Sequence, residues 1–349
     1  MQGKADTGRY YLVAKHKKLS IAQSRDMIIS DDLIATGLNA TGTRHKAMKN
    51  LESFLAKFQK LSVFTKKGQR APHKPLLLLY ALAKLQRDQQ KFITFNDAEK
   101  DVAPLIEMYR PWSNASSTVS YPYNRLANDM KDIWWFEDKP NLLGPGGDLR
   151  VTEARSLNIK AGFTHDTIKI FEQNPHLIEN VATLLLSHHF ADGLHEEILE
   201  AVGLEIGSDT TSLVPKKNRN PEFRREVINA YFEQCCFCDF DMKLNGRGIA
   251  LEAAHIQWHA ANGPDQVING LALCVLHHRL FDFGALTVLS DHTIHVSENI
   301  AGNWARKLTS ELQNKKIRPP RKTEYSPAGE YLKWHHEQVF KGKIGERHA

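Results

Sequence analysis

The sequence contains no run of apolar residues long enough to cross a membrane, which takes about 18 residues or more. Its most apolar stretch, residues 75–83, ends at Lys84 and predicts a buried helix. The first residues also lack the apolar core of a secretory signal. These absences argue against a membrane protein or a secreted one, and we expect a cytoplasmic protein with no membrane partner.

Cysteine is scarce as well. Only four of the 349 residues are cysteines, and all of them lie between positions 235 and 274. Four thiols in a chain of this length do not make the dense disulfide framework of a small secreted scaffold. Their clustering in a cytoplasmic protein favours metal binding instead.

The chain also lacks a strong excess of charge of either sign. The formal net charge is +6 and the pI about 9.0, with 42% hydrophobic and 25% charged residues. This composition is ordinary for a globular protein that buries proper cores. The mild positive charge is compatible with nucleic-acid binding and equally with a merely basic protein. At about 150 residues per domain, the length predicts two or three domains.

Composition divides the chain into four parts. Residues 1–45 are polar and predict an N-terminal extension, and residues 46–203 predict a first domain. Residues 204–221 predict a linker, because most of this stretch is polar, basic and poor in apolar side chains. Residues 222–349 predict a second domain. We expect an α+β protein whose first domain is mainly helical with a small sheet.

Periodicity predicts the elements of both domains. In the first, we expect helices at 51–58, from Pro75 onward, at 97–109, 176–189 and 193–202, with a strand at 133–136. In the second, we expect a helix at 223–234, strands at 251–256 and 293–296, and a final helix at 327–339.

Two ligand pairs with metal-binding spacing frame the second domain. Cys235 and Cys238 form a C-x-x-C pair, and Cys274 and His277 form a C-x-x-H pair. Two-residue spacing brings both ligands of a pair onto one side of an ion, so the four predict a tetrahedral Zn²⁺ site. Cys236 is then a spare thiol. A closed site of four protein ligands has no room for water, so this zinc would stabilise the fold and take no part in chemistry.

Between and beside these pairs stand three further polar residues. His255 ends a strand-like segment, a Gly-Pro-Asp turn follows at 263–265, and Asn269 comes next. His278 directly follows a zinc ligand, so the zinc would fix the direction of its ring. The order His255, Asn269, His278 within the cysteine frame resembles the zinc-bearing branch of the HNH nuclease family. The resemblance implies two antiparallel strands and a helix, the ββα-metal fold, around one catalytic Mg²⁺ or Mn²⁺ ion.

The chemistry of phosphodiester hydrolysis suggests a role for each of His255, Asn269 and His278. A histidine with a near-neutral pKa is a suitable general base for the attacking water, and we expect His255 to be that base. His278 is the best candidate ligand of the catalytic ion, and Asn269 should position the His255 loop through its amide.

The second ligand of this ion is left open by the sequence. In many HNH nucleases an acidic residue or a histidine precedes the base, whereas this chain has Ala254 there. Glu252, Asp265 and Asp282 are the alternatives.

The first domain carries two clusters that could contact DNA. Both combine basic, aromatic or proline side chains, and their members are His73, Lys74, Tyr121, Pro122, Tyr123 and Arg125. With the leucine-rich run at 76–79, they resemble the sulfur-binding domain of phosphorothioate-dependent (type IV) restriction enzymes. That domain precedes an HNH domain in the family, which matches the order here. The resemblance implies a double-stranded DNA partner with sulfur in its backbone.

A physical reason for sulfur recognition exists. Sulfur is larger and less hydrated than the phosphate oxygen it replaces, so a small apolar pocket should prefer it, since burying an oxyanion without donors is costly. Tyr121 and Pro122 could line that pocket, while His73 and Lys74 hold the neighbouring phosphate. A lysine makes a point contact where an arginine would make a fork.

Two alternatives remain open. The first domain could read a methylated or hydroxymethylated base, or plain sequence, and Trp112, Trp134 and Trp135 could supply the aromatic pocket for a flipped base. The whole chain could instead be a zinc-containing DNA-binding regulator without catalysis. For a nuclease with one site per chain, a double-strand break requires a homodimer or two independent nicks.

Overall fold

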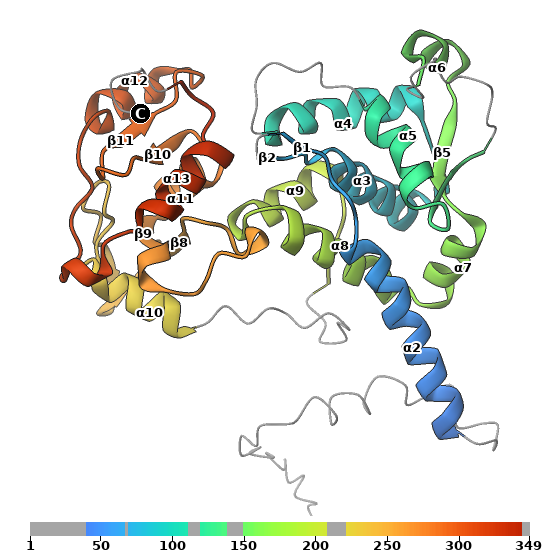
Figure 1. The fold of residues 1–349 in the computed structure, drawn as a ribbon, viewed down its shortest axis with the longest axis horizontal. Coiled ribbons are helices and arrows are strands. Elements are labelled where there is room, and N and C mark those ends of the chain that lie inside the picture. The colour runs from blue at the N-terminus through green and yellow to red at the C-terminus, as the bar shows by residue number, and fades with distance from the viewer. Residues whose placement is uncertain (1–39, 67–68, 111–118, 138–148, 208–220, 344–349) are drawn as a thin grey trace, which may run out of the picture. The chain divides into compact units, whose positions relative to one another are not determined.

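The computed structural model describes residues 40–66, 69–110, 119–137, 149–207 and 221–343 (Figure 1). The chain divides into two compact units, Met1–Leu51 and Glu52–Ala349, so nearly all of the two predicted domains, 46–203 and 222–349, falls within the second unit. The described residues form an α+β protein of helices and small antiparallel sheets, as predicted. Across these ranges no helix is both long and apolar enough to span a membrane. The linker predicted at 204–221 lies largely outside the described residues.

The central element of the first domain is α3 (His73–Asp88), whose residues 75–83 are all buried. It contacts α4 (Phe95–Tyr109), α5 (Ser120–Asp129), α8 (His176–His189) and α9 (His195–Val202), and Figure 1 shows it among them. A helix that is apolar on all sides requires such surroundings. The prediction of a buried helix is therefore confirmed.

The start of α3 differs from the prediction. The helix begins at His73, so Pro75 occupies its third position and not its first. The first intrahelical bond runs from the N–H of Leu76 to the carbonyl of Pro72. The first N–H groups of any helix have no partner within it, so a proline one turn from the end removes no bond.

A three-stranded antiparallel sheet packs beside these helices, with strand order β3 (Phe92–Thr94), β5 (Lys160–Phe163), β4 (Trp134–Phe136). The sequence predicted only the strand around β4. The first domain also contains α2 (Ala40–Gln59), α6 (Val151–Leu157), α7 (His165–Gln173), the short helix η1 (Asp192–Leu194) and the hairpin of β1 (Thr65–Lys66) with β2 (Gln69–Arg70).

The second domain is built on the antiparallel pair β8 (Leu251–His255) and β9 (Gly270–Cys274), followed at once by α11 (Val275–Asp282). This is the ββα arrangement that the resemblance implied. Helix α10 (Pro221–Ala230) packs on the two strands. The approach is close, since a Cβ on Gly270 would stand only 2.4 Å from a methyl carbon of Val227.

Shorter elements complete this domain. They are β6 (Lys243–Leu244), β7 (Arg247–Gly248), β10 (Leu286–Val288), β11 (Ile294–Val296), α12 (Asn303–Leu312), α13 (Gly329–Gln338) and the short helices η2 (His259–Ala261), η3 (Val267–Asn269) and η4 (Thr323–Tyr325). The helix expected at 223–234 ends earlier, because Phe232 and Glu233 take positive φ values of 61° and 57°. Helix α12 was not predicted.

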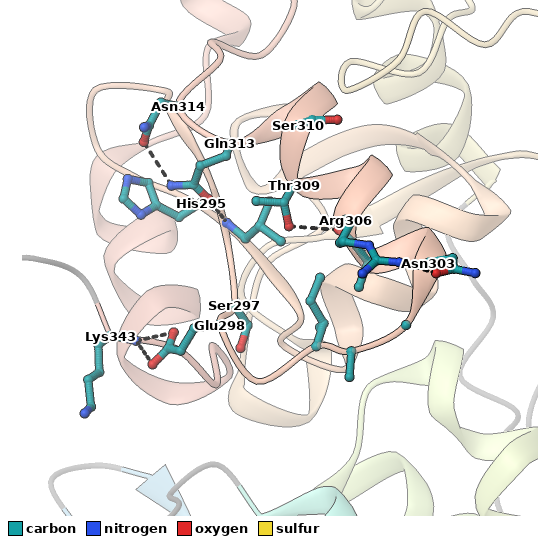
Figure 2. A pocket seen from close by; sticks show the side chains of 15 residues that line it. His295, Ser297, Glu298, Asn303, Arg306, Thr309, Ser310, Gln313, Asn314 and Lys343 are labelled. Carbon is teal, nitrogen blue, oxygen red and sulfur yellow. Dashed lines mark hydrogen bonds between the residues drawn. The ribbon is translucent and has the colours of Figure 1, made fainter.

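A groove in the C-terminal part of this domain runs along α12 and the end of β11 (Figure 2). Gln313 accepts a hydrogen bond from the N–H of Val296 at 2.8 Å. Glu298 accepts one from the N–H of Lys343 at 3.0 Å. These bonds fasten α12 and the C-terminal segment to the sheet, and the groove is lined by none of the predicted site residues.

Candidate active site

The two predicted ligand pairs meet in one cluster. One ligand atom from each of Cys235, Cys238, Cys274 and His277 lies within 4.8 Å of the other three. The Nδ1 atom of His277 is 3.3 Å from the sulfur of Cys274 and 3.6 Å from that of Cys235. Cys236 is buried but stands outside the cluster, as expected of the spare thiol. The four residues could hold a metal ion.

Local backbone geometry explains how the cluster forms. A turn closes when the N–H of Cys235 donates to the carbonyl of Phe240 and the N–H of Asp239 donates to that of Cys235, both at 2.9 Å. The N–H of Cys236 donates to Ala272 on β9, which ties this turn to the strand. Cys274 is the N-cap of α11 and lies three residues before His277, so both face the turn.

The side chains of the cluster shift one another's pKa values through hydrogen bonds, which raise the pKa of Cys238 and lower that of Cys274. Hydrogen bonds from Cys235 and Cys238 hold the pKa of Cys274 far below its usual range. Burial lowers the pKa of His277, but hydrogen bonds with Cys235 and Cys274 outweigh that effect and raise it to about 9. Three sulfurs and one imidazole, all buried except for the exposed Cys238, fit a tetrahedral zinc ion.

His255 is the last residue of β8 and its ring is held on two sides. Its Nε2 atom lies 2.9 Å from the Oδ1 atom of Asp265. Its face stacks on Phe223 of α10, with centroids 4.1 Å apart and an interplanar angle of 15°. Burial lowers the pKa of His255, while the hydrogen bond with Asp265 opposes that shift. The ring is therefore neutral at pH 7, which is the form a general base needs.

Asn269 clamps the loop that follows His255. Its side chain is fully buried. The amide nitrogen donates to the carbonyls of Gln257 at 3.1 Å and Pro264 at 3.0 Å, and the amide oxygen accepts from the N–H of Gln257 at 2.8 Å. A Cβ on Gly263 would stand 1.8 Å from the Gln257 carbonyl oxygen, so only glycine permits this close loop. The geometry agrees with the positioning role predicted for Asn269.

His278 lies between two carboxylates. Its Nδ1 atom is 2.7 Å from the Oε2 atom of Glu252, and its Nε2 atom is 3.4 Å from the Oδ2 atom of Asp282. Burial raises the pKa of Asp282 to about 6. That Oδ2 atom is buried and has no hydrogen-bond partner among the described residues. Imidazole and carboxylate groups can bind a hard divalent cation, but the two carboxylates face different nitrogens of this ring. Among the described residues, the cysteine cluster is the only group whose ligand atoms already lie together. Asp265, the third alternative ligand, contacts His255 instead.

In the first domain, the His73 ring is neutral and the Lys74 ammonium group already has partners within the protein. Burial, and then the charge of Arg110, lowers the pKa of His73 to about 4, so its ring is neutral at pH 7. Lys74 donates to the carbonyl of Ser62 at 2.6 Å and forms an ion pair with Asp129. Any phosphate contact by Lys74 would have to compete with these two partners.

The second predicted cluster lies on α5, and its members divide between surface and core. Tyr121 is 51% exposed and Arg125 is exposed one helical turn later, so the two share a face. Pro122 is buried. Tyr123 is fully buried, and its hydroxyl donates to the carbonyls of Ile93 and Ile159 at 2.6 and 2.9 Å. Tyr123 therefore presents no surface that could contact DNA, contrary to the prediction.

Tyr123→Phe is expected to destabilise the first domain. The change leaves two buried carbonyl oxygens without this donor, which should lower the free energy of unfolding by about 1–3 kcal/mol. Urea unfolding followed by circular dichroism measures the effect. The exposed Tyr121→Phe is the matched control and should leave stability unchanged. Equal stability of both variants would show that the Tyr123 hydroxyl does not hold the sheet to α5.

Two of the three tryptophans considered for a flipped base lie in the described residues. Trp134 is 1% exposed and its indole N–H donates to the carbonyl of Tyr123, so it belongs to the core. Trp135 is half-buried, and its ring lies beside those of Phe92 and His165. Trp112 lies outside the described residues.

Sequence reasoning missed three contacts of the sites: Asp265 on His255, Phe223 on His255, and Arg110 near His73. Only Asp265 could have been found from its place between the motif residues.

Comparisons with known proteins identify two regions. Residues 51–206 match the family described as ScoMcrA-like, DNA sulfur-binding domain, and residues 235–289 match the family described as HNH endonuclease. No curated protein matches the sequence.

Solved structures are similar to the first region. The sulfur-binding domain of ScoMcrA complexed with phosphorothioated DNA matches at 24% identity and a TM-score of 0.38, over 43% of this chain and 95% of that one. The corresponding SprMcrA complex matches at 19% identity and a TM-score of 0.36, over 44% and 94%. The type IV phosphorothioation-dependent restriction endonuclease ScoMcrA matches at 23% identity and a TM-score of 0.36, over 43% of this chain and only 32% of its own.

Proposed function

We propose that this chain, whose residues 51–206 match a DNA sulfur-binding domain family and whose residues 235–289 match an HNH endonuclease family, restricts DNA carrying backbone phosphorothioates. In this proposal the first domain binds the modified strand, and the HNH site hydrolyses phosphodiester bonds nearby. Because its substrate is DNA, we place the protein in the cytoplasm.

Recognition of sulfur would fall to the exposed face of α5. Tyr121 offers apolar surface next to the Pro122 ring, and Arg125 offers a charge one turn away. A soft, weakly hydrated sulfur gains from such surface, whereas an oxygen anion would lose hydration there. Since His73 is neutral, it would act as a hydrogen-bond donor to phosphate oxygen and not as a counter-charge.

Cleavage would begin at His255. Its neutral ring takes a proton from a water molecule, and the resulting hydroxide attacks phosphorus. Asn269 keeps the His255 loop in place through three hydrogen bonds. The 3′ oxygen then leaves, so the products carry 5′-phosphate and 3′-hydroxyl ends.

The proposal includes two kinds of ion. We assign Zn²⁺ to the cluster of Cys235, Cys238, Cys274 and His277, where it would stabilise the fold. We assign Mg²⁺ or Mn²⁺ to His278 together with one of its two carboxylates, Asp282 or Glu252, because these two face different nitrogens of the ring. When bound there, the divalent cation supplies stabilisation of the charge that develops on the leaving oxygen. One site per chain makes a double-strand break either as a homodimer or in two nicks.

The observation that carries this proposal is the pairing of each motif histidine with its own carboxylate on one ββα frame. His255 has Asp265, and His278 has Glu252 and Asp282. A non-catalytic regulator has no use for these pairs. The test is incubation of a phosphorothioated duplex with Mn²⁺ or with EDTA. We expect the duplex to be cleaved with Mn²⁺ and to stay intact with EDTA. A duplex that stays intact under both conditions would favour the non-catalytic regulator.

A binding competition separates the sulfur mark from the others. We expect a phosphorothioated duplex to compete better than a methylated or a plain duplex of the same sequence. Tyr121→Ala should remove most of this preference. Leu157→Ala, which also truncates a large exposed side chain of this domain, is the control. A preference for the methylated duplex would replace sulfur with a modified base as the mark.

A further inference from the structure

We infer that Asp265 is a positioning residue that holds the His255 ring in one tautomer, with the proton on Nε2 and the basic lone pair on Nδ1. The inference rests on the proposed function, because it concerns the general base of that reaction. Asp265 was an alternative metal ligand by sequence, and the geometry points to this different role.

The hydrogen bond between the two residues fixes which nitrogen carries the proton. A carboxylate only accepts hydrogen bonds, so the nitrogen that faces it must donate. The nitrogen of His255 that faces Asp265 is Nε2, at 2.9 Å from Oδ1. In a neutral imidazole the other nitrogen then carries the lone pair. Only Nδ1 can therefore take a proton from water.

Stacking fixes the plane of the same ring. Phe223 lies 4.1 Å from the His255 centroid at 15°, and His259 lies 5.9 Å away at 25°. Rotation about the Cβ–Cγ bond would break the first stack and the hydrogen bond together. The side chains of His255 and Asp265 are only 20% and 28% exposed, so water competes weakly for their bond.

The buried Asn269 links this pair to the HNH motif. Its amide nitrogen donates to the carbonyl of Gln257, two residues after His255, and to that of Pro264, one residue before Asp265. One amide thus holds both the base and the carboxylate that orients it. In this arrangement the Asn269 amide, which cannot transfer protons itself, serves to position His255 and Asp265.

The step balances as follows. Water gives one proton to Nδ1 of His255 while its oxygen forms the new bond to phosphorus. The bond to the 3′ oxygen breaks, this oxygen leaves with the electron pair and takes a proton from solvent, and the imidazolium later returns its proton to solvent. The ring becomes an imidazolium whose charge faces Asp265, so the carboxylate stabilises the product of the proton transfer without receiving the proton itself.

The first test measures the tautomer in the full-length wild-type protein. Nitrogen-15 spectra of histidine-labelled protein, with the His255 signals assigned by their loss in His255→Ala, should show a protonated Nε2 and a bare Nδ1. A bare Nε2 at neutral pH would overturn the inference, whether or not any variant folds.

The second test is kinetic. A positioned general base contributes about 10²–10⁴-fold, so Asp265→Asn should reduce kcat by roughly 10–100-fold, short of the loss in His255→Ala, with KM for DNA unchanged. Asp265→Glu should restore part of the rate. Asp241→Asn, which removes an exposed carboxylate of the same domain, is the control and should cleave normally.

Each outcome separates the inference from the proposed function. Wild-type kcat in Asp265→Asn, together with an inactive His255→Ala, would refute the positioning role and leave the base assignment intact. A rate that recovers at high Mn²⁺ would make Asp265 a metal ligand and refute the inference as well. Full activity of His255→Ala would instead refute the proposed mechanism.

Discussion

Cleavage of phosphorothioated DNA is expected to disappear when His255 is replaced by alanine, while DNA binding is retained. The change removes the group that we propose as general base, and such groups contribute about 10²–10⁴-fold. It does not touch α5, where recognition is proposed. Single-turnover cleavage and gel shifts on the same duplex measure the two properties separately.

The control for this variant is His176→Ala, which removes an exposed histidine in the first turn of α8. It should cleave and bind as the wild type does. Cleavage by His255→Ala at the parental rate would show that another group activates the water. Loss of binding together with cleavage would mean that His255 acts on the fold and not on the chemistry.

Loss of the cysteine cluster is expected to unfold the second domain. Structural zinc sites contribute about 10–16 kcal/mol of binding free energy in small domains, and whole domains are stable by only about 5–15 kcal/mol. Cys274→Ser removes a ligand that is also the N-cap of α11, the helix that carries His278. We expect the variant to contain no zinc, to be digested rapidly by protease within 222–349, and to lack cleavage activity.

Cys236→Ala is the matched control, because Cys236 is buried beside the cluster without being a ligand. It should keep one zinc per chain, measured by elemental analysis, and it should cleave DNA. A Cys274→Ser protein that remains folded and active would show that the cluster is not a stabilising metal site.

The cluster of Cys235, Cys238, Cys274 and His277 was predictable from the sequence because the two ligands of each pair lie close together along the chain. Two ligands separated by two residues must lie on one turn, so each half-site is determined by its own few residues. The ββα frame was implied by the resemblance to the HNH family that the order of His255, Asn269 and His278 carries. The partner of His255 was not predictable in the same way, because three nearby carboxylates could each have reached the ion or the ring.

The recognition domain was harder to predict in detail because its contacts are distant in sequence. Lys74 and Asp129 lie 55 residues apart, and nothing in either motif indicates that they pair. Tyr121 and Tyr123 look equivalent in the motif, yet helical geometry turns one to solvent and the other to the core. The strands β3 and β5 were missed because each is short and is held by pairing with residues far along the chain: β3 pairs with β5, and β5 pairs with both β3 and β4.

The most direct measurement of the central claim is digestion of two plasmids that are identical except for sulfur in the backbone of one. With Mn²⁺ or Mg²⁺ present, we predict that the protein breaks both strands of the sulfur-containing plasmid and leaves the plain one supercoiled. Equal digestion of both plasmids, or digestion of the plain one alone, would contradict the account.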